Sequence, residues 1–556
     1  MEWDNLSRRS LRFRTLLLLC LLIPALAVLV WAVQHHPDPP PTKPGPATIR
    51  VDTRAPSTPV SPLIFGATVE WTENGNRIFD PAAGKLRVDI LNALRPLRIP
   101  VWRFPGGILS DHYVWRSGVG PIAARPKAQN PMDRTVHENN FGTDEFIAFC
   151  RSLQSQPLIT ANFGSGSLEN TLEWQKYFLA QGFPVPYWEI GNEIYLSEPR
   201  DNATIPGNDK RIFKTSAEYA AGFKEWAAAL RKADPNIKVG AIAATYNASK
   251  EHRDWLDQLV NQAGSSADFV ALHNSYAPLV FGSYSYTDDH KRQLAYQAMF
   301  AQPAFAAEDI RKVEDRYSSG KKPDIAITEH FPLFGAGGSQ HQILQILDQS
   351  RTLASALYTA SLFHTYIREH VWMANYNIAV SKWFGALLTD GDSGLIKTPT
   401  YYVFDLYRNH FGDRMHPTEV KSDTYNSSQV GMTNARENVP YLDAVSTSDA
   451  DGNLYLAVIN RNLFYPVETA IEVNGSAPAG DASTLTLSGP SPNSVNGPSI
   501  ESSAQANGRI EEVASQPKAT HGQYSFPPAS LTILKWLPAQ TGGKAEVSER
   551  KHVANH

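Results

Sequence analysis

Residues 187–193, YWEIGNE, and residues 324–330, DIAITEH, are two short, largely apolar runs that each reach a glutamate at or near the end. A buried strand of a parallel barrel has this form when its last residues face the cleft at the barrel mouth. Similar runs recur along the chain with room for a helix between them. The candidate strands are Leu63–Glu70, Val101–Gly106, Leu158–Phe163, Tyr187–Asn192, Val239–Ala243, Phe269–His273, Ile325–Glu329 and Val371–Tyr376.

Helical periodicity fills the intervals between these strands. The predicted helices are Leu86–Leu97, Asp144–Gln154, Leu168–Leu179, Ser216–Lys232, Asp254–Gln262, Phe305–Tyr317, Thr352–Ile367 and Tyr402–Phe411. Eight strands alternating with eight helices predict an α/β fold, a closed (β/α)8 barrel (TIM barrel) over residues 61–411. An open doubly wound sheet would need a phosphate-binding glycine loop after its first strand, and the sequence has none there.

The pattern changes from about Gly412 to short strands separated by turn residues, which predicts an antiparallel β-sandwich over residues 412–537. Its candidate strands are Leu442–Ser446, Leu454–Asn460, Glu468–Val473, Thr484–Leu487 and Leu531–Leu534. Thr48–Asp52 also has strand character but precedes the barrel, so we expect residues 48–60 to join the sandwich. Residues 538–556 are predicted to be disordered.

The N-terminus carries a targeting signal. Four arginines at positions 8, 9, 12 and 14 precede an uncharged stretch, Leu16–Val33, whose 18 residues would span roughly 27 Å as a helix, just enough to cross a bilayer. By the positive-inside rule residues 1–36 predict a cytoplasmic stub and an anchor helix, with the catalytic part exported. Cleavage after Ala25-Leu26-Ala27 is the alternative. Residues 37–47 are a Pro-rich linker.

Composition narrows the function further. The formal charge of −4 over 556 residues and the absence of a basic block beyond the extreme N-terminus argue against nucleic acid as a partner. Of the two cysteines, Cys20 lies in the N-terminal apolar run and Cys150 on the apolar face of a predicted helix. The folded part therefore has no internal disulfide, and Cys150 is expected to be a core residue. The oligomeric state is left open.

Carboxylates and amides gather where the predicted strands end, and in a barrel these ends lie together. The strand ends contribute Glu70, Asn162, Asn192, Glu193, His273, Tyr276, Glu329, Asn375 and Asn377. Two carboxylates over one sugar ring are sufficient to cleave a glycosidic bond, because one protonates the leaving oxygen and the other attacks the anomeric carbon. Trp71, Trp115 and Trp372 are candidate surfaces for stacking on sugar rings or parts of the core.

The chain resembles family-51 glycoside hydrolases, best known as α-L-arabinofuranosidases, across roughly residues 48–536. The matching stretches are IFG at 64–66, VE at 69–70, RFPGG at 103–107, Tyr113, Trp115, GVGP at 118–121, NFGTDEF at 140–146, EIGNE at 189–193, LHN at 272–274, TPTY at 398–401 and SFPP at 525–528. The RFPGG and NFGTDEF segments are the most selective of these.

The resemblance implies roles for the strand-end residues. Glu193 would be the general acid/base, with a pKa raised toward neutrality, and Glu329 the nucleophile of a retaining reaction, with the two carboxyls about 5–5.5 Å apart. Asn192 would bind the sugar 2-hydroxyl, and Glu70 and Tyr276 other hydroxyls. His273 would line the pocket. No metal or cofactor is required.

For three further polar residues a structural role is considered beside or instead of a catalytic one. Asn162 could bind substrate or merely tie down a loop. Arg103 is expected to be a buried partner for glutamates, and Glu189 an internal ion-pair partner outside the chemistry.

The chain departs from the family after Gly107, where Ile108-Leu109 replaces Asn-Phe, and after Glu329, where His330-Phe331 replaces Trp-Asn or similar. We expect both departures to lie near the substrate, which leaves the sugar open. The leading expectation is a retaining exo-α-L-arabinofuranosidase acting on an oligosaccharide or polysaccharide outside the cytoplasm. The alternatives are another retaining barrel glycosidase (a β-xylosidase, endoglucanase or glucuronidase) and a non-catalytic carbohydrate-binding envelope protein.

Overall fold

The structure of the protein is a computed structural model. It describes residues 43–131, 135–196, 215–245, 254–277, 279–280, 289–317, 320–332, 334–335, 349–382, 385–391, 393–497, 514–515, 519 and 521–538.

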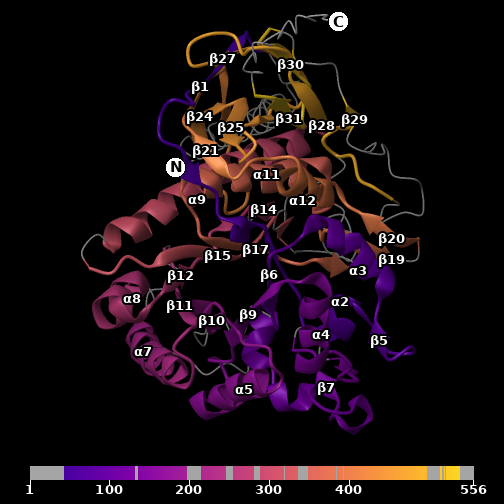
Figure 1. The fold of residues 1–556 in the computed structure, drawn as a ribbon, viewed down its shortest axis with the longest axis vertical. Helices are drawn as coiled ribbons and strands as arrows, with labels where there is room; N and C mark the ends of the chain where they lie inside the picture. The colour runs from indigo at the N-terminus through magenta and orange to yellow at the C-terminus, as the bar shows by residue number, and fades with distance from the viewer. Residues whose placement is uncertain are drawn as a thin grey trace, which may run out of the picture. The chain divides into compact units, whose positions relative to one another are not determined.

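Eight parallel strands form a closed barrel, as the sequence predicts. In order round the ring they are β3 (Gly66–Thr68), β6 (Val101–Phe104), β9 (Gln156–Ala161), β10 (Tyr187–Ile190), β11 (Lys238–Ile242), β12 (Phe269–Ala271), β15 (Asp324–Phe331) and β17 (Met373–Tyr376). The ring closes because β17 pairs in parallel with β3. Figure 1 looks into this ring, with helices outside it. Each observed strand overlaps one of the eight predicted strands.

The predicted helices are also present. They are α3 (Val88–Leu94) continued by η2 (Arg95–Leu97), α4 (Thr143–Leu153), α5 (Leu168–Ala180), α7 (Ser216–Ala233), α8 (Trp255–Ala263), α9 (Asp289–Arg316), α11 (Leu353–Arg368) and α12 (Pro399–Asn409). Hydroxyl side chains cap several of them. Thr215 forms a capping box with Glu218 at α7, and Thr398 precedes the N1 proline of α12.

Helix α9 begins at Asp289, well before the predicted start at Phe305. Pro303 lies inside this helix. Proline removes one intrahelical hydrogen bond and normally marks a helix boundary, so the sequence pattern placed the start after it.

The C-terminal module consists of two packed β-sheets. One contains β22 (Thr418–Lys421), β1 (Ala47–Val51), β27 (Val467–Val473) and β30 (Gln523–Phe526). The other contains β2 (Thr58–Pro59), β21 (Arg414–His416), β25 (Leu442–Ser448), β26 (Leu454–Asn460), β31 (Ser530–Trp536), β28 (Ser483–Leu487) and β29 (Ala514–Ser515). The buried side chains Ile49, Leu456 and Phe526 pack between them. The sandwich is antiparallel except where β1 pairs in parallel with β27.

Shorter elements complete the fold. They are α2 (Thr72–Asn76), β4 (Phe79–Asp80), β5 (Lys85–Leu86), β7 (Ala128–Gln129), β8 (Val136–His137), β13 (Ser275–Tyr276), β14 (Leu279–Val280), β16 (Phe334–Gly335), β18 (Val380–Ser381), β19 (Leu388–Gly391), β20 (Gly394–Lys397), β23 (Thr424–Ser427) and β24 (Arg436–Pro440), with the 3-10 turns η1 (Pro62–Phe65), η3 (Ile108–His112), η4 (Trp115–Gly118), η5 (Ile122–Ala124), η6 (Ile194–Leu196) and η8 (Gly264–Ser266).

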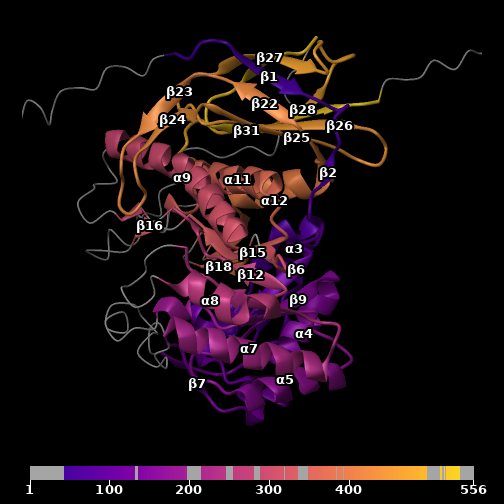
Figure 2. The same cartoon turned by 90° about the vertical axis from the view of Figure 1, so that its left-hand side faces the viewer.

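The sandwich packs against helix α11 of the barrel, and Figure 2 shows β25, β26 and β31 on the side that faces this helix. The buried carboxylate of Asp443 accepts from Arg368 at 2.7 Å and from Arg461 at 2.6 Å. Burial alone would raise the pKa of Asp443, but the two arginines hold it well below its usual value. This ion-pair cluster joins α11 to β25.

Several predictions concern segments that the structure does not describe. The predicted anchor Leu16–Val33 lies outside the described residues, as do residues 539–556 of the predicted tail. No helix in the described part of the chain combines the length and the apolar character needed to cross a membrane.

Candidate active site

The two predicted catalytic glutamates lie at the carboxyl ends of barrel strands. Glu193 follows β10, and Glu329 lies near the end of β15. The backbone turns sharply after β10, where Gly191 has φ 80° and Glu193 φ 44°. A Cβ atom added to Gly191 would lie only 2.9 Å from Ile194 Cγ1. The turn therefore requires glycine at 191 and holds Glu193 in a backbone conformation that few non-glycine residues adopt, as is common at functional sites.

A single histidine brings the two carboxylates together. Glu193 Oε1 lies 3.0 Å and Glu329 Oε2 lies 4.0 Å from the same atom, His273 Nδ1. The two oxygens are therefore separated by no more than the sum of these distances, about 7 Å. This separation allows both carboxylates to act on one sugar ring.

Arg103, on β6, holds three of the surrounding groups with one buried guanidinium. Its Nη1 donates to Glu329 Oε2 at 2.9 Å, its Nε to Glu189 Oε2 at 2.9 Å, and its Nη2 to Asn192 Oδ1 at 2.6 Å. Burial would lower the pKa of Arg103, but Glu189 and Glu329 raise it above its ordinary value, so the group stays charged. Arg103 and Glu189 thus form the internal pair expected from the sequence, and the Asn192 amide is oriented by the same arginine.

A β-bulge explains why two consecutive residues of β15 reach into the barrel. Along β15, the register with β17 shifts between Ile327 and His330. The extra residue interrupts the normal alternation of side chains. Thr328 consequently contacts Glu189 and His273, while the adjacent Glu329 contacts Arg103.

Glu329 is surrounded by donors and by closely packed backbone. Besides Arg103, Asn377 donates from its Nδ2 to Glu329 Oε1 at 3.1 Å. A Cβ atom added to Gly107 would come within 2.7 Å of Glu329 Oε2. Position 107 thus requires glycine, because the loop that follows β6 passes directly over the Glu329 carboxylate.

Glu70 and Tyr276 lie near the Glu329 carboxylate. Asn76 Nδ2 donates to Glu70 Oε2 at 3.0 Å, and the Asn76 Oδ1 accepts from the Glu70 backbone N–H at 2.6 Å. Loss of hydration, with a smaller contribution from the negative charge of Glu329, raises the pKa of Glu70 to about 7. Burial, and then the charges of Glu329 and Glu193, raise the pKa of Tyr276, so its hydroxyl remains a hydrogen-bond donor.

Asn162 has mainly loop contacts in the structure. Its Nδ2 donates to the Tyr113 carbonyl at 3.2 Å, and its Oδ1 accepts from the backbone N–H groups of Ser165 and Gly166. Its side chain therefore ties two loops together at the barrel mouth. A contact between Asn162 and substrate stays a prediction.

The three candidate stacking tryptophans are packed rather than free. Trp71 is buried and donates from its indole nitrogen to the Leu109 carbonyl, and Trp115 is buried against Tyr177. Trp372 precedes β17 and therefore lies at the end of the barrel opposite the glutamates. Their aromatic faces serve packing.

The expectation that both departures from the family lie near the substrate is wrong for His330. Its ring is fully buried and lies 5.4 Å from the Tyr366 ring and 6.1 Å from the Phe363 ring, both on α11. Strand alternation resumes after the bulge, so the residue following Glu329 points outward to the helix layer. Leu109, in the other departure, is buried and accepts from Trp71, close to the loop over Glu329.

Three contacts in the site were missed from sequence. Thr328 was overlooked because regular alternation turns it away from Glu329. Tyr195 donates to Glu193 Oε1 at 3.3 Å from the turn η6, and Asn377 donates to Glu329. Asn377 was counted among the strand-end residues, but its contact with Glu329 was not predicted.

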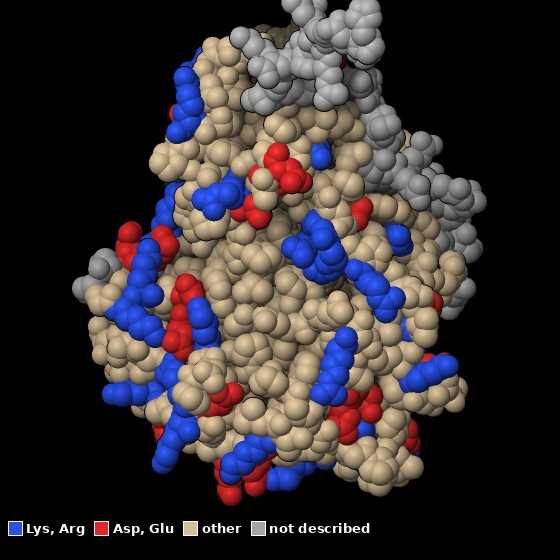
Figure 3. All heavy atoms as spheres, in the orientation of Figure 1, with Lys and Arg blue, Asp and Glu red and all other residues tan. Residues whose placement is uncertain are grey.

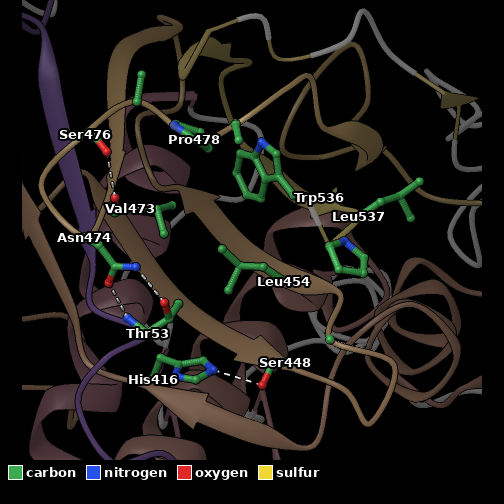
Figure 4. A pocket seen from close by; sticks show the side chains of 14 residues that line it. Thr53, His416, Ser448, Leu454, Val473, Asn474, Ser476, Pro478, Trp536 and Leu537 are labelled. Atoms are coloured by element: carbon green, nitrogen blue, oxygen red, sulfur yellow. Dashed lines mark hydrogen bonds between the residues drawn. The ribbon is translucent and has the colours of Figure 1, made fainter. Parts of the chain in front are cut away.

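One hollow in the described part of the sandwich lacks the carboxylates of the barrel site. This hollow of about 530 Å³ is lined by residues that include His416, Asn474 and Trp536, and none of its lining residues is acidic. In Figure 4 its polar groups bond to one another, Asn474 to Thr53 and His416 to Ser448. On the face in Figure 3, basic and acidic side chains are interspersed.

Domain models, relatives and solved structures that are named as α-L-arabinofuranosidases match the chain. The model for the alpha-L-arabinofuranosidase 1 domain matches residues 93–181, and that for the alpha-L-arabinofuranosidase C-terminal domain matches residues 336–530. The chain is 27% identical over 514 residues to a probable alpha-L-arabinofuranosidase C of Aspergillus clavatus, covering 86% of this chain and 94% of the relative.

Solved structures agree with these matches. An alpha-L-arabinofuranosidase from Thermotoga maritima in an arabinose complex superposes with a TM-score of 0.70 at 26% identity, covering 88% of this chain and 99% of that one. A GH51 alpha-L-arabinofuranosidase from Thermotoga petrophila superposes with a TM-score of 0.68 at 26% identity, covering 88% and 100%.

A closed (β/α)8 barrel with two carboxylates meeting at the ends of its strands defines the class of barrel glycoside hydrolases. Within this class, the matches to domain models, relatives and structures are to α-L-arabinofuranosidases. The chain is a family-51-like glycoside hydrolase of the α-L-arabinofuranosidase type.

Proposed function

We propose that this protein is a retaining exo-α-L-arabinofuranosidase that releases non-reducing arabinofuranosyl residues from oligosaccharides or polysaccharides outside the cytoplasm. The observation that carries the proposal is the convergence of Glu193 and Glu329 on His273 Nδ1, which keeps the two carboxylate oxygens within about 7 Å of each other. Two carboxylates at this spacing can act on one anomeric centre from opposite sides.

Glu329 is the nucleophile in this proposal. A nucleophilic carboxylate must be ionised, and the Arg103 guanidinium at 2.9 Å and the Asn377 amide at 3.1 Å both stabilise negative charge on it. Its attack on the anomeric carbon forms a glycosyl-enzyme ester as the bond to the leaving oxygen breaks. Water then hydrolyses the ester, and the configuration at the anomeric carbon is retained.

Glu193 is the general acid/base. It protonates the leaving oxygen in the first step and takes a proton from the attacking water in the second. Asn192 binds the 2-hydroxyl with the amide that Arg103 orients, an interaction that strengthens at the transition state. Glu70 and Tyr276 bind further hydroxyls of the same sugar.

The choice of arabinofuranose follows from what the chain resembles. The names of the relatives and structures support it, including the Thermotoga maritima structure in an arabinose complex. The outward position of His330 removes that residue from contact with the sugar, whereas its neighbour Phe331 packs against Tyr276, with ring centroids 5.1 Å apart.

A panel of nitrophenyl glycosides tests the activity. We expect release from the α-L-arabinofuranoside, with arabinose as the sole product from arabinan and arabinoxylan. Release from the β-xyloside, a glucoside or a glucuronide but not from the arabinofuranoside would overturn the sugar assignment. No release from any member of the panel, by protein that still binds the polymers, would favour a carbohydrate-binding protein.

Export rests on the N-terminal segment alone. Four arginines before the uncharged stretch Leu16–Val33 favour an anchor helix with the hydrolase outside the cytoplasm. Activity that is accessible to added protease on intact cells and sediments with membranes would support the anchor. Soluble extracellular protein that begins shortly after Ala27 would instead show a cleaved signal, and protease-resistant activity released only on lysis would contradict export.

A further inference from the structure

A chain of hydrogen bonds behind the two catalytic glutamates fixes where the protons are. Glu189 is fully buried, and its carboxylate receives three donors: Arg103 Nε at 2.9 Å and Thr160 Oγ1 at 2.7 Å on Oε2, and Thr328 Oγ1 at 2.5 Å on Oε1. A carboxylate paired with a buried arginine is ionised and can only accept. The hydroxyl proton of Thr328 is therefore committed to Glu189.

Because the Thr328 hydroxyl proton is donated to Glu189, the tautomer of His273 is determined. The Thr328 Oγ1 atom also lies 3.0 Å from His273 Nε2. A hydroxyl has one proton, and that of Thr328 is already donated to Glu189, so Thr328 must accept from the histidine. His273 thus carries a proton on Nε2, assigned here from the hydrogen-bond network.

The other ring nitrogen of His273 then faces Glu193. Glu193 Oε1 lies 3.0 Å from His273 Nδ1, a hydrogen-bond distance. A neutral ring protonated on Nε2 has a lone pair on Nδ1, and a lone pair cannot approach an ionised carboxylate oxygen this closely. One proton therefore lies between the two atoms, either on Glu193 or on His273.

We propose that Glu189, Thr328 and His273 are positioning residues that hold this shared proton beside Glu193 for delivery to the leaving oxygen. The inference rests on the proposed function, in which Glu193 is the acid/base. In the first step Glu329 bonds to the anomeric carbon, the bond to the leaving oxygen breaks, and the proton of the Glu193–His273 pair passes through Glu193 to that oxygen. In the second step water bonds to the anomeric carbon, Glu329 leaves, and the proton of water returns to the pair.

The charged groups around His273 agree with this role. Glu193 and Glu189 come from β10 and its end, and Glu329 from β15, all within 4.0 Å of a ring nitrogen. Tyr276, on β13, is a further titratable neighbour, with ring centroids 6.3 Å apart, and Tyr195 donates to the same Glu193 oxygen that faces His273. The cation Arg103 donates to Glu189 and Glu329, two of the carboxylates that lie beside the histidine. Three carboxylates therefore surround the ring.

Thr328 gives a matched pair of variants. Thr328→Val keeps the shape of the side chain but removes the hydroxyl, whereas Thr328→Ser keeps the hydroxyl. Both are assayed on aryl glycosides of whichever sugar the parent enzyme cleaves, so that failure of the arabinofuranose assignment does not affect the result. Only the acidity of the phenol leaving group is varied, because dinitrophenolate leaves without a proton and a weakly acidic phenol does not.

We expect Thr328→Val to lose about 10- to 100-fold in kcat/KM on the weakly acidic phenol, part of the 10²–10⁴ that a general acid supplies, and little on the dinitrophenyl glycoside. Thr328→Ser should behave as the parent does. An equal loss on both substrates, or no loss on either, would overturn the proposal, because a purely structural role is indifferent to the leaving group. If Thr328→Val does not fold, His273→Gln is assayed on the same two substrates and judged by the same criterion. Its amide cannot transfer a proton to Glu193.

Discussion

Glu193 and Glu329 face one atom, His273 Nδ1, at 3.0 and 4.0 Å. The two glutamates are 136 positions apart in the sequence, the difference between their residue numbers, yet parallel strands of a barrel bring their carboxyl ends to one mouth. Their environments differ: Glu329 is held by the cation Arg103, and Glu193 by the titratable His273 and the Tyr195 hydroxyl. A carboxylate beside a fixed cation and one beside a proton carrier suit the nucleophile and the acid/base respectively.

Neutralising either glutamate should abolish hydrolysis without unfolding the protein. Glu193→Gln is expected to reduce kcat/KM by about 10²–10⁴-fold, and Glu329→Gln by at least as much, because no covalent intermediate can form. The measurement is kcat/KM on a glycoside of a weakly acidic phenol that the parent enzyme cleaves, because this leaving group needs the proton from Glu193. Glu173→Gln, which changes a half-exposed carboxylate on α5, is the control and should keep full activity. Undiminished activity of Glu329→Gln would contradict the assignment.

Arg103 should be irreplaceable by lysine. An ammonium group cannot donate to Glu189, Glu329 and Asn192 in the planar geometry of a guanidinium, so Arg103→Lys leaves buried acceptors unpaired. We expect a loss of roughly 3–5 kcal/mol in the free energy of unfolding together with loss of activity. Chemical denaturation measures the first quantity. The matched Arg116→Lys, in a largely exposed ion pair with Glu173, should change stability by less than about 0.5 kcal/mol.

Glu70 should make the protein less stable as the pH rises. Burial raises its pKa from 4.5 to about 7. The folded state therefore keeps the proton that the unfolded state gives up, and stability present below about pH 4.5 is lost progressively up to about pH 7, by at most about 3 kcal/mol. Glu70→Gln, compared with the parent enzyme by denaturation at about pH 5 and pH 8, should remove this part of the pH dependence.

The neighbouring Glu73 is exposed and provides the control for that experiment. Glu73→Gln should change the parent pH profile of stability only slightly, because the charge of Glu73 is a minor cause of the raised pKa of Glu70. A Glu70→Gln variant whose stability falls between pH 5 and pH 8 as much as that of the parent would show that Glu70 ionises freely in the folded protein.

His330 should make the protein less stable as the pH falls, the opposite of the effect of Glu70. It should have no part in catalysis. Neither ring nitrogen has a hydrogen-bond partner among the described residues, and burial lowers the pKa of His330 from 6.5 to about 3. Stability is complete above about pH 6.5 and is lost as the pH falls toward 3, by up to about 5 kcal/mol. His330→Leu should remove this acid sensitivity and keep full activity at neutral pH. A changed sugar preference in the variant would contradict the outward position of the ring.

The barrel and the two glutamates could be predicted from sequence because both follow from simple rules. Buried parallel strands are continuous apolar runs, and their carboxyl ends meet, so Glu193 and Glu329 had to be close. Glu189 was separated from the chemistry by strand alternation, and Arg103 proved to be its partner.

The residues that were misjudged depend on features that residue type does not reveal. Thr328 faces the site only because of the bulge in β15, and Asn162 could not be separated from a loop residue without its contacts. The predicted helix was shorter than α9 because a proline usually ends a helix, whereas Pro303 is tolerated inside this one. The outward direction of His330 did follow from alternation, and the expectation of a substrate contact ignored it.

Trapping the covalent intermediate tests the central claim most directly. An arabinofuranosyl compound with fluorine at the 2-position and a good leaving group slows both steps but hydrolysis of the ester most, so the sugar stays attached to the nucleophile. Mass spectrometry of the digested protein should find one added fluorosugar, on the peptide that contains Glu329 and on that carboxyl group. Attachment to Glu193, Glu70 or Glu189, or no attachment to an enzyme that turns over the corresponding nitrophenyl glycoside, would contradict the account.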